Sequence, residues 1–149
     1  MGKLLDFNFF GRFLVVTLLM GICSSCGFLN HGERMYLNQI YGINEIRMPA
    51  SKSDSAWLRA KWFIRNYSSL RLLTSNDSVI ATERPTIGGS GFGYKVTRRR
   101  VADSLLLLSA FSFPPMVDPL APEKSSRDSF ILTDYMKTGL IPFPQLIYK

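Results

Sequence analysis

The apolar residues in the middle of the chain recur with the spacing of a helix. From Ser53 to Tyr67 they fall at intervals of three and four residues, which places them on one side of a helix. Ser53 is a good N-cap residue, and Asp54 would lie favourably near the positive end of the helix dipole. The predicted buried face consists of Ala56, Trp57, Ala60, Phe63, Ile64 and Tyr67.

The opposite side of this helix is basic but also carries two large apolar residues. Lys61 and Arg65 lie there, together with Leu58 and Trp62, which are four residues apart. Either another part of the chain covers this apolar pair, or the patch contacts lipid headgroups or a protein partner, where tryptophan is common. The candidate contact residues are therefore Leu58, Lys61, Trp62 and Arg65.

After this helix the pattern shortens to the period of strands. Residues 70–74 and 79–83 are short runs rich in aliphatic and β-branched side chains, and Ser-Asn-Asp-Ser between them is typical of a turn. These features predict a β-hairpin. Apolar and polar residues alternate over 92–97, so we expect a third strand that runs into Arg98–Arg100.

The last third of the chain has a less uniform pattern. Residues 101–113 contain four consecutive leucines, which fit either a strand buried on both faces or a helix capped by Asp103. Prolines over 114–122 indicate an extended loop, and residues 128–138 predict a second helix that ends at Gly139. The tail that follows, with two more prolines, is expected to lie extended along the surface. The elements together predict an α+β domain over residues 51–149, with helices packed on one face of an antiparallel sheet of short strands.

Composition narrows the class of protein. The chain has 149 residues, enough for one domain, and 46% of them are hydrophobic, which excludes a disordered tail. The net charge of +7 favours anionic surfaces, but charge by itself identifies no partner.

The N-terminus has the order of regions found in a secretory signal. Lys3 and Arg12 precede an apolar run over 13–22, and small residues follow the run. Ten residues at a rise of roughly 1.5 Å are too short for a bilayer core of roughly 30 Å. Extending the run back to Phe7 would bring in Arg12, at a cost of roughly 2.5–3.5 kcal/mol at a helix centre. Residues 1–25 are therefore predicted to be a signal peptide, with an uncleaved membrane anchor as the alternative.

The residues that close this run resemble the lipobox of bacterial lipoproteins. Ser24 and Ser25 stand just before Cys26, as small residues do before the lipidated cysteine of that family. The sequence departs from the family pattern at Cys23, where leucine is usual. The resemblance implies lipidation of Cys26, a tether over residues 26–50 and a cell-envelope location. Because no acidic run follows Cys26, it also implies an outer-membrane anchor that faces the periplasm.

Other chemistry for the two cysteines is less well supported. A thioredoxin-like redox pair would need a folded α/β unit upstream, and a structural zinc site would need four ligands where the sequence adds only His31. We expect no metal and no cofactor.

The remaining motifs do not predict catalysis. The glycine-rich stretch over 88–93 lacks the spacing of phosphate-binding loops and leads into a strand, and Arg98–Arg100 would point to alternate faces of that strand. His31 lies in the predicted tether, and the aspartates are scattered along the chain. We predict no catalytic residue and expect no nucleic-acid partner.

Residues 50–113 also resemble small bacterial lipoprotein domains of unknown function whose fold is similar to that of TATA-box-binding protein. That resemblance implies a fold and an envelope location only. The sequence therefore predicts a lipid-anchored envelope protein that acts as a non-catalytic binding or structural module, with a possible protein partner in the envelope. The alternative is an uncleaved single-pass subunit of an envelope complex. An envelope hydrolase would require carboxylates, or a serine and an acid, to converge in a pocket.

Overall fold

The computed structural model describes residues 29–149, except residues 88, 90, 116–118 and 149. The chain divides into two compact units, Met1–Arg34 and Met35–Lys149. The predicted signal peptide, Cys23 and Cys26 lie outside the described residues. In the described part of the first unit, Asn30 and Glu33 cap the start of helix α2 (His31–Ile40), since each side chain accepts a hydrogen bond from the other's backbone N–H at 2.8 Å.

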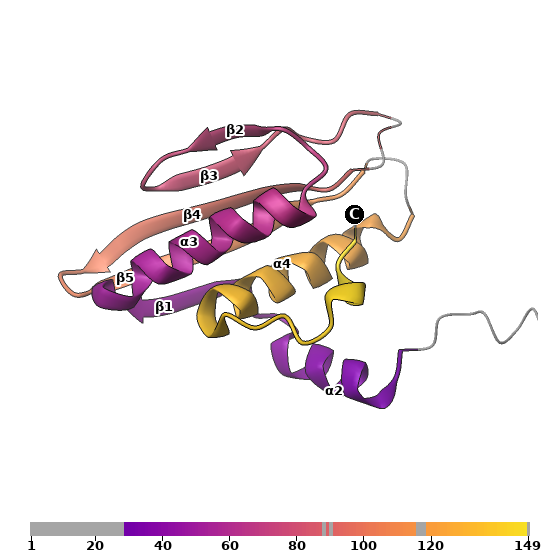
Figure 1. Cartoon of the computed structure of the whole chain (residues 1–149), viewed down its shortest axis with the longest axis horizontal. Coiled ribbons are helices and arrows are strands. Elements are labelled where there is room, and N and C mark those ends of the chain that lie inside the picture. The colour runs from indigo at the N-terminus through magenta and orange to yellow at the C-terminus, as the bar shows by residue number, and fades with distance from the viewer. Residues whose placement is uncertain (1–28, 88, 90, 116–118, 149) are drawn as a thin grey trace, which may run out of the picture. The chain divides into compact units, whose positions relative to one another are not determined.

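The second unit is an α+β fold built on a five-stranded antiparallel sheet, as predicted. The strand order is β1-β5-β4-β3-β2, so β1 and β2 form the two edges. Helices α3 and α4 lie on the same face of the sheet (Figure 1). The strands are β1 (Glu45–Pro49), β2 (Leu72–Ser75), β3 (Val79–Thr82), β4 (Gly93–Ala102) and β5 (Leu105–Phe113).

The first long helix, α3 (Ala50–Tyr67), confirms the predicted buried face and the predicted end. Its start is three residues earlier than expected. Ser53 is therefore not the N-cap: its hydroxyl donates to the carbonyl of Ala50 at 2.9 Å, and Pro49 occupies the cap position. Proline suits this position because its preset φ leads into a helix without needing an N–H partner. Tyr67 is only half-buried.

The hairpin and the third strand are also confirmed. In the turn between β2 and β3, the side-chain oxygen of Asn76 accepts hydrogen bonds from the backbone N–H groups of Ser78, at 3.0 Å, and Val79, at 2.8 Å. This is the local bonding that makes asparagine a turn residue. The strand predicted to follow the hairpin is β4, and it continues through Arg98–Arg100, whose side chains point to alternate faces. Arg98 donates a hydrogen bond to the carboxylate of Asp54 on α3 at 2.6 Å, whereas Arg99 is exposed.

Three expectations need correction. The prediction of a tether is wrong for residues 31–49, which contain α2 and β1. Strand β1 belongs to the sheet because its alternating pattern buries Ile46 and Met48. Helix α4 (Ala121–Thr138) begins seven residues before the predicted start, with a proline in its first turn, where no N–H is needed. Leu146, in a short 3-10 turn (Pro144–Leu146), and Ile147 are buried, so the tail packs into the domain.

The four-leucine run is a strand rather than a helix. Residues of β5 pair with β1 on one side and β4 on the other, so Leu108 lies between Ile46 and Arg98. The core lies between this sheet and the helices. Its largest fully buried apolar and aromatic side chains are Phe63, Ile80, Tyr94, Val96, Leu108, Ile131, Leu132 and Met136.

Candidate functional site

The predicted contact residues divide into two groups on α3. Leu58 and Trp62 are 64% and 48% exposed, so the described part of the chain leaves both open to solvent. The ring of Trp62 packs against those of Tyr67 and Tyr135, with ring centroids 6.1 and 5.6 Å apart. Lys61 and Arg65 lie elsewhere on the helix and line a groove that Trp62 does not line.

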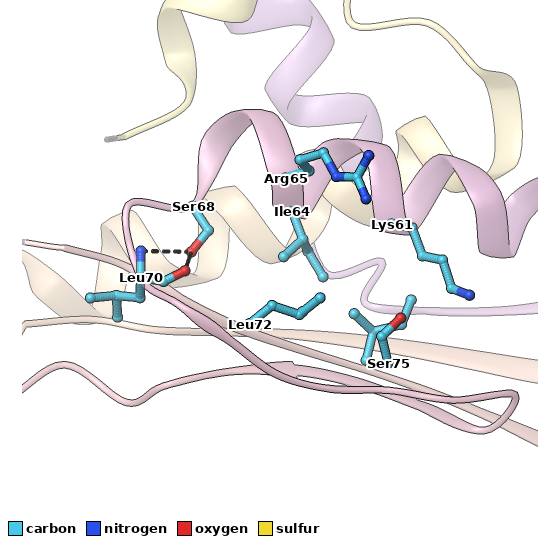
Figure 2. A pocket seen from close by; sticks show the side chains of 8 residues that line it. Lys61, Ile64, Arg65, Ser68, Leu70, Leu72 and Ser75 are labelled. Atoms are coloured by element: carbon cyan, nitrogen blue, oxygen red, sulfur yellow. Dashed lines mark hydrogen bonds between the residues drawn. The ribbon is translucent and has the colours of Figure 1, made fainter.

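This groove lies between the second half of α3 and the β2–β3 hairpin. Its cavity volume is about 240 Å³. Figure 2 shows Lys61, Ile64 and Arg65 on the helix above Leu72 and Ser75 of β2. We call this cavity the β2 groove; it is lined by Lys61, Ile64, Arg65, Ser68, Leu70, Leu72, Ser75 and Ile80.

One end of the β2 groove is closed by the turn that follows α3. The hydroxyl of Ser68 accepts a hydrogen bond from the backbone N–H of Leu70 at 3.1 Å and lies 3.3 Å from the carbonyl of Phe92. These bonds hold the chain where it leaves the helix and turns into the sheet. Leu70 thereby becomes part of the lining.

Strand β2 itself is an open edge. Among the described strands it pairs with β3 alone, and all four of its residues are exposed, with Leu72 at 47% and Leu73 at 63%. An edge strand presents one row of backbone N–H and C=O groups without strand partners. Its pairing is also irregular between Leu72 and Thr74. The β2 groove therefore combines apolar lining with an adjacent strand that can accept another strand.

The charge of the β2 groove is positive. Lys61 and Arg65 are its charged lining residues, and no carboxylate lines it. Among the described residues, neither of these two cations forms a salt bridge. The groove can thus attract an acidic group without first breaking an ion pair.

A second polar feature is buried in the core, away from the β2 groove. The carboxylate of Asp128 is fully buried, accepts a hydrogen bond from the Tyr94 hydroxyl at 2.8 Å and lies 3.3 Å from the backbone nitrogen of Tyr148. Burial raises the pKa of Asp128 to about 7, although both hydrogen bonds and Arg127 oppose the shift. Burial likewise raises the pKa of Tyr94, so its hydroxyl stays protonated and donates. This pair joins α4, β4 and the C-terminal segment.

Comparisons with known proteins identify no family. No protein-family model, curated protein or solved structure matches the chain. Within the described residues, no helix is both long and apolar enough to cross a membrane, and no three His, Cys, Asp or Glu side chains are grouped to hold a metal ion.

Proposed function

We propose that this protein is a cell-envelope binding module, anchored by lipid at Cys26, that captures an extended segment of a protein partner along β2. The lipobox-like Ser24-Ser25-Cys26 supports the anchor. The observation that carries the binding function is the β2 groove beside an open edge strand.

The size of the groove favours side chains of a peptide over a small molecule. At about 240 Å³ it lies below the roughly 300–1,000 Å³ usual for small-molecule sites. When a peptide adds to a sheet edge, its backbone bonds the strand and alternate side chains enter pockets on one face. Leu72 lies both on β2 and in the groove, so a strand added beside it would direct side chains over Ile64.

The lining also defines the chemistry of the partner. Leu70 and Leu72 offer an apolar surface for aliphatic or aromatic side chains, while Ile64 and Ile80 complete the lining as buried residues. Lys61 and Arg65 offer charge for a carboxylate. The segment that fits best is extended and contains both apolar and acidic residues.

A peptide-binding experiment tests this function. Fluorescence anisotropy of the full-length protein should show binding of a short peptide that alternates valine and glutamate, but not of one that alternates valine and lysine. Replacing both Lys61 and Arg65 with glutamate should weaken binding by about tenfold or more, equivalent to about 1.4 kcal/mol. The matched control is Arg99→Glu with Arg100→Glu, because both side chains are exposed on β4 and neither lines the groove.

The role of the edge strand has its own test with the same assay. Methylating alternate backbone nitrogens of the valine-glutamate peptide removes donors needed for strand addition and leaves every charge in place. We expect the methylated peptide to lose binding. Equal binding of the valine-glutamate peptide with and without methylation would contradict strand addition. An equal loss of affinity in the Lys61/Arg65 variant and in the Arg99/Arg100 control would contradict the β2 groove as the site.

The anchor is tested separately by intact mass and membrane partitioning in a bacterial host. The wild-type chain should lose residues 1–25, gain acyl mass and remain with membranes, because the Cys26 thiol is the group that is lipidated. Cys26→Ala should be unprocessed, and Cys23→Ala should behave as the wild type. If all three keep the whole N-terminus, the uncleaved anchor becomes the better reading.

A further inference from the structure

A second, larger hollow lies at the opposite edge of the sheet. It is bounded by β1, the first half of α3 and the end of α4, and its cavity volume is about 770 Å³. We call it the β1 cleft. It shares no lining residue with the β2 groove, so it has to be explained by itself.

The β1 cleft gathers cations from three elements. Arg47 comes from β1, Lys52 and Arg59 from α3, and Lys137 from α4. The single acidic lining residue is Glu45, which already accepts a hydrogen bond from the Ser109 hydroxyl at 2.8 Å. Because side chains alternate along β1, Glu45 and Arg47 lie on the face opposite Ile46 and Met48, and Lys52, Arg59 and Lys137 are the cations on the helix side of the sheet.

The tertiary structure holds Arg59 in place. Arg59 donates to the carbonyls of Met136 and Lys137 at 3.1 and 3.2 Å, which joins α3 to the C-terminal end of α4. These carbonyls are neutral, so they do not compensate the positive charge of the guanidinium. In the part of the chain that the structure describes, Arg47, Lys52 and Lys137 form no salt bridge. A bound anion would compensate these positive charges.

The floor of the β1 cleft is apolar. Ile46, Met48 and Met136 belong to the lining and are buried, whereas Ile43 is exposed. Methionine side chains adapt to irregular apolar ligands. The volume lies within the roughly 300–1,000 Å³ usual for sites that take small molecules. A ligand that matches this lining has an anionic head and an apolar body.

We propose that the β1 cleft binds a phosphate-bearing amphiphile, namely the headgroup and upper chains of an anionic phospholipid. Lys52 and Lys137 bind the phosphate, and Arg59 supports them from its fixed position. The upper acyl chains lie against Met48 and Ile43. A phosphate monoester carries more negative charge than a zwitterionic lipid, so the cleft selects phosphatidic acid over phosphatidylcholine.

Native mass spectrometry of the full-length protein, released from maltoside micelles, tests the proposal by counting bound lipids. The probes are dioctanoyl phosphatidic acid and dioctanoyl phosphatidylcholine, which share their chains and differ in headgroup. The wild type should bind the first about tenfold more tightly. Lys52→Glu with Lys137→Glu should reduce that affinity to the level of phosphatidylcholine. The control, Arg99→Glu with Arg100→Glu, makes the same change of charge outside the cleft and should bind as the wild type.

Three results would overturn the proposal: equal binding of the two lipids, equal loss in the cleft and control variants, or full displacement of phosphatidic acid by equimolar inorganic phosphate. The last result would identify free phosphate as the ligand. Should the charge-reversed cleft variant fail to fold by circular dichroism, Lys52→Gln with Lys137→Gln replaces it, and unchanged selectivity there also rejects the cleft. Because the β2 groove is not involved, failure here leaves the peptide-binding function standing.

Discussion

Replacing Phe63 with alanine is expected to lower the free energy of unfolding by about 3–5 kcal/mol, the usual cost of removing a buried phenylalanine ring. Phe63 is fully buried, and its ring lies 4.8, 5.8 and 6.0 Å from those of Tyr67, Tyr94 and Tyr135. Alanine would leave a cavity where α3 meets the sheet and α4. Because α3 supplies lining to both hollows, peptide binding at the β2 groove and lipid binding at the β1 cleft should both weaken when the domain is destabilised.

Urea unfolding followed by circular dichroism measures this loss. The matched control is Leu58→Ala, on the same helix, whose side chain is mostly exposed and should change stability by less than about 0.5 kcal/mol. A similar loss for the two variants would show that the buried side of α3 is not the one described.

The stability of the domain is expected to fall as pH rises from about 4 to about 7, because Asp128 is buried. Its pKa is raised from 3.8 to about 7 in the folded state, so the folded chain binds a proton that the unfolded chain has released. This contribution to stability is fully present below the unfolded pKa and is lost as pH rises through the folded pKa. The slope approaches about 1.4 kcal/mol per pH unit, and the whole effect is on the order of 4 kcal/mol.

The measurement is the free energy of unfolding across this pH range for the wild type and Asp128→Asn. The asparagine side chain does not titrate in this range, so the plot of unfolding free energy against pH for Asp128→Asn should lack the fall that Asp128 causes in the wild type. Asp103→Asn is the control, since Asp103 is exposed and should leave the wild-type slope unchanged. Parallel curves for wild type and Asp128→Asn would show that the carboxylate is not buried in the folded chain as described.

The candidate sites were only partly visible in the sequence. Lys61 and Arg65 were recognisable from their place on a predicted helix, and the structure places both in the β2 groove. Leu72 was recognisable as a strand residue, but nothing in its local sequence showed that α3 would leave its side chain exposed. The β1 cleft was not predicted, because residues 31–49 were interpreted as tether and because its cations come from segments far apart in the chain.

Local chemistry determined the elements that the sequence identified correctly. The period of apolar residues defined the buried face of α3, Asn76 defined the hairpin turn, and Gly139, with φ of 78°, ends α4 where few other residues can adopt that conformation. These features depend on neighbours within a few residues. They could therefore be read before any tertiary contact was known.

Only the tertiary structure decided the elements whose patterns are ambiguous or short. The leucines at 105–108 became a strand because β1 and β4 satisfy their backbone on both sides, and Glu45–Pro49 became a strand because β5 offers its edge. The same pairing leaves β1 and β2 as edges and so creates both hollows. Hydrogen bonds between strands join residues distant in sequence, and that is why the sequence alone specified the helix faces but not the binding sites beside the sheet.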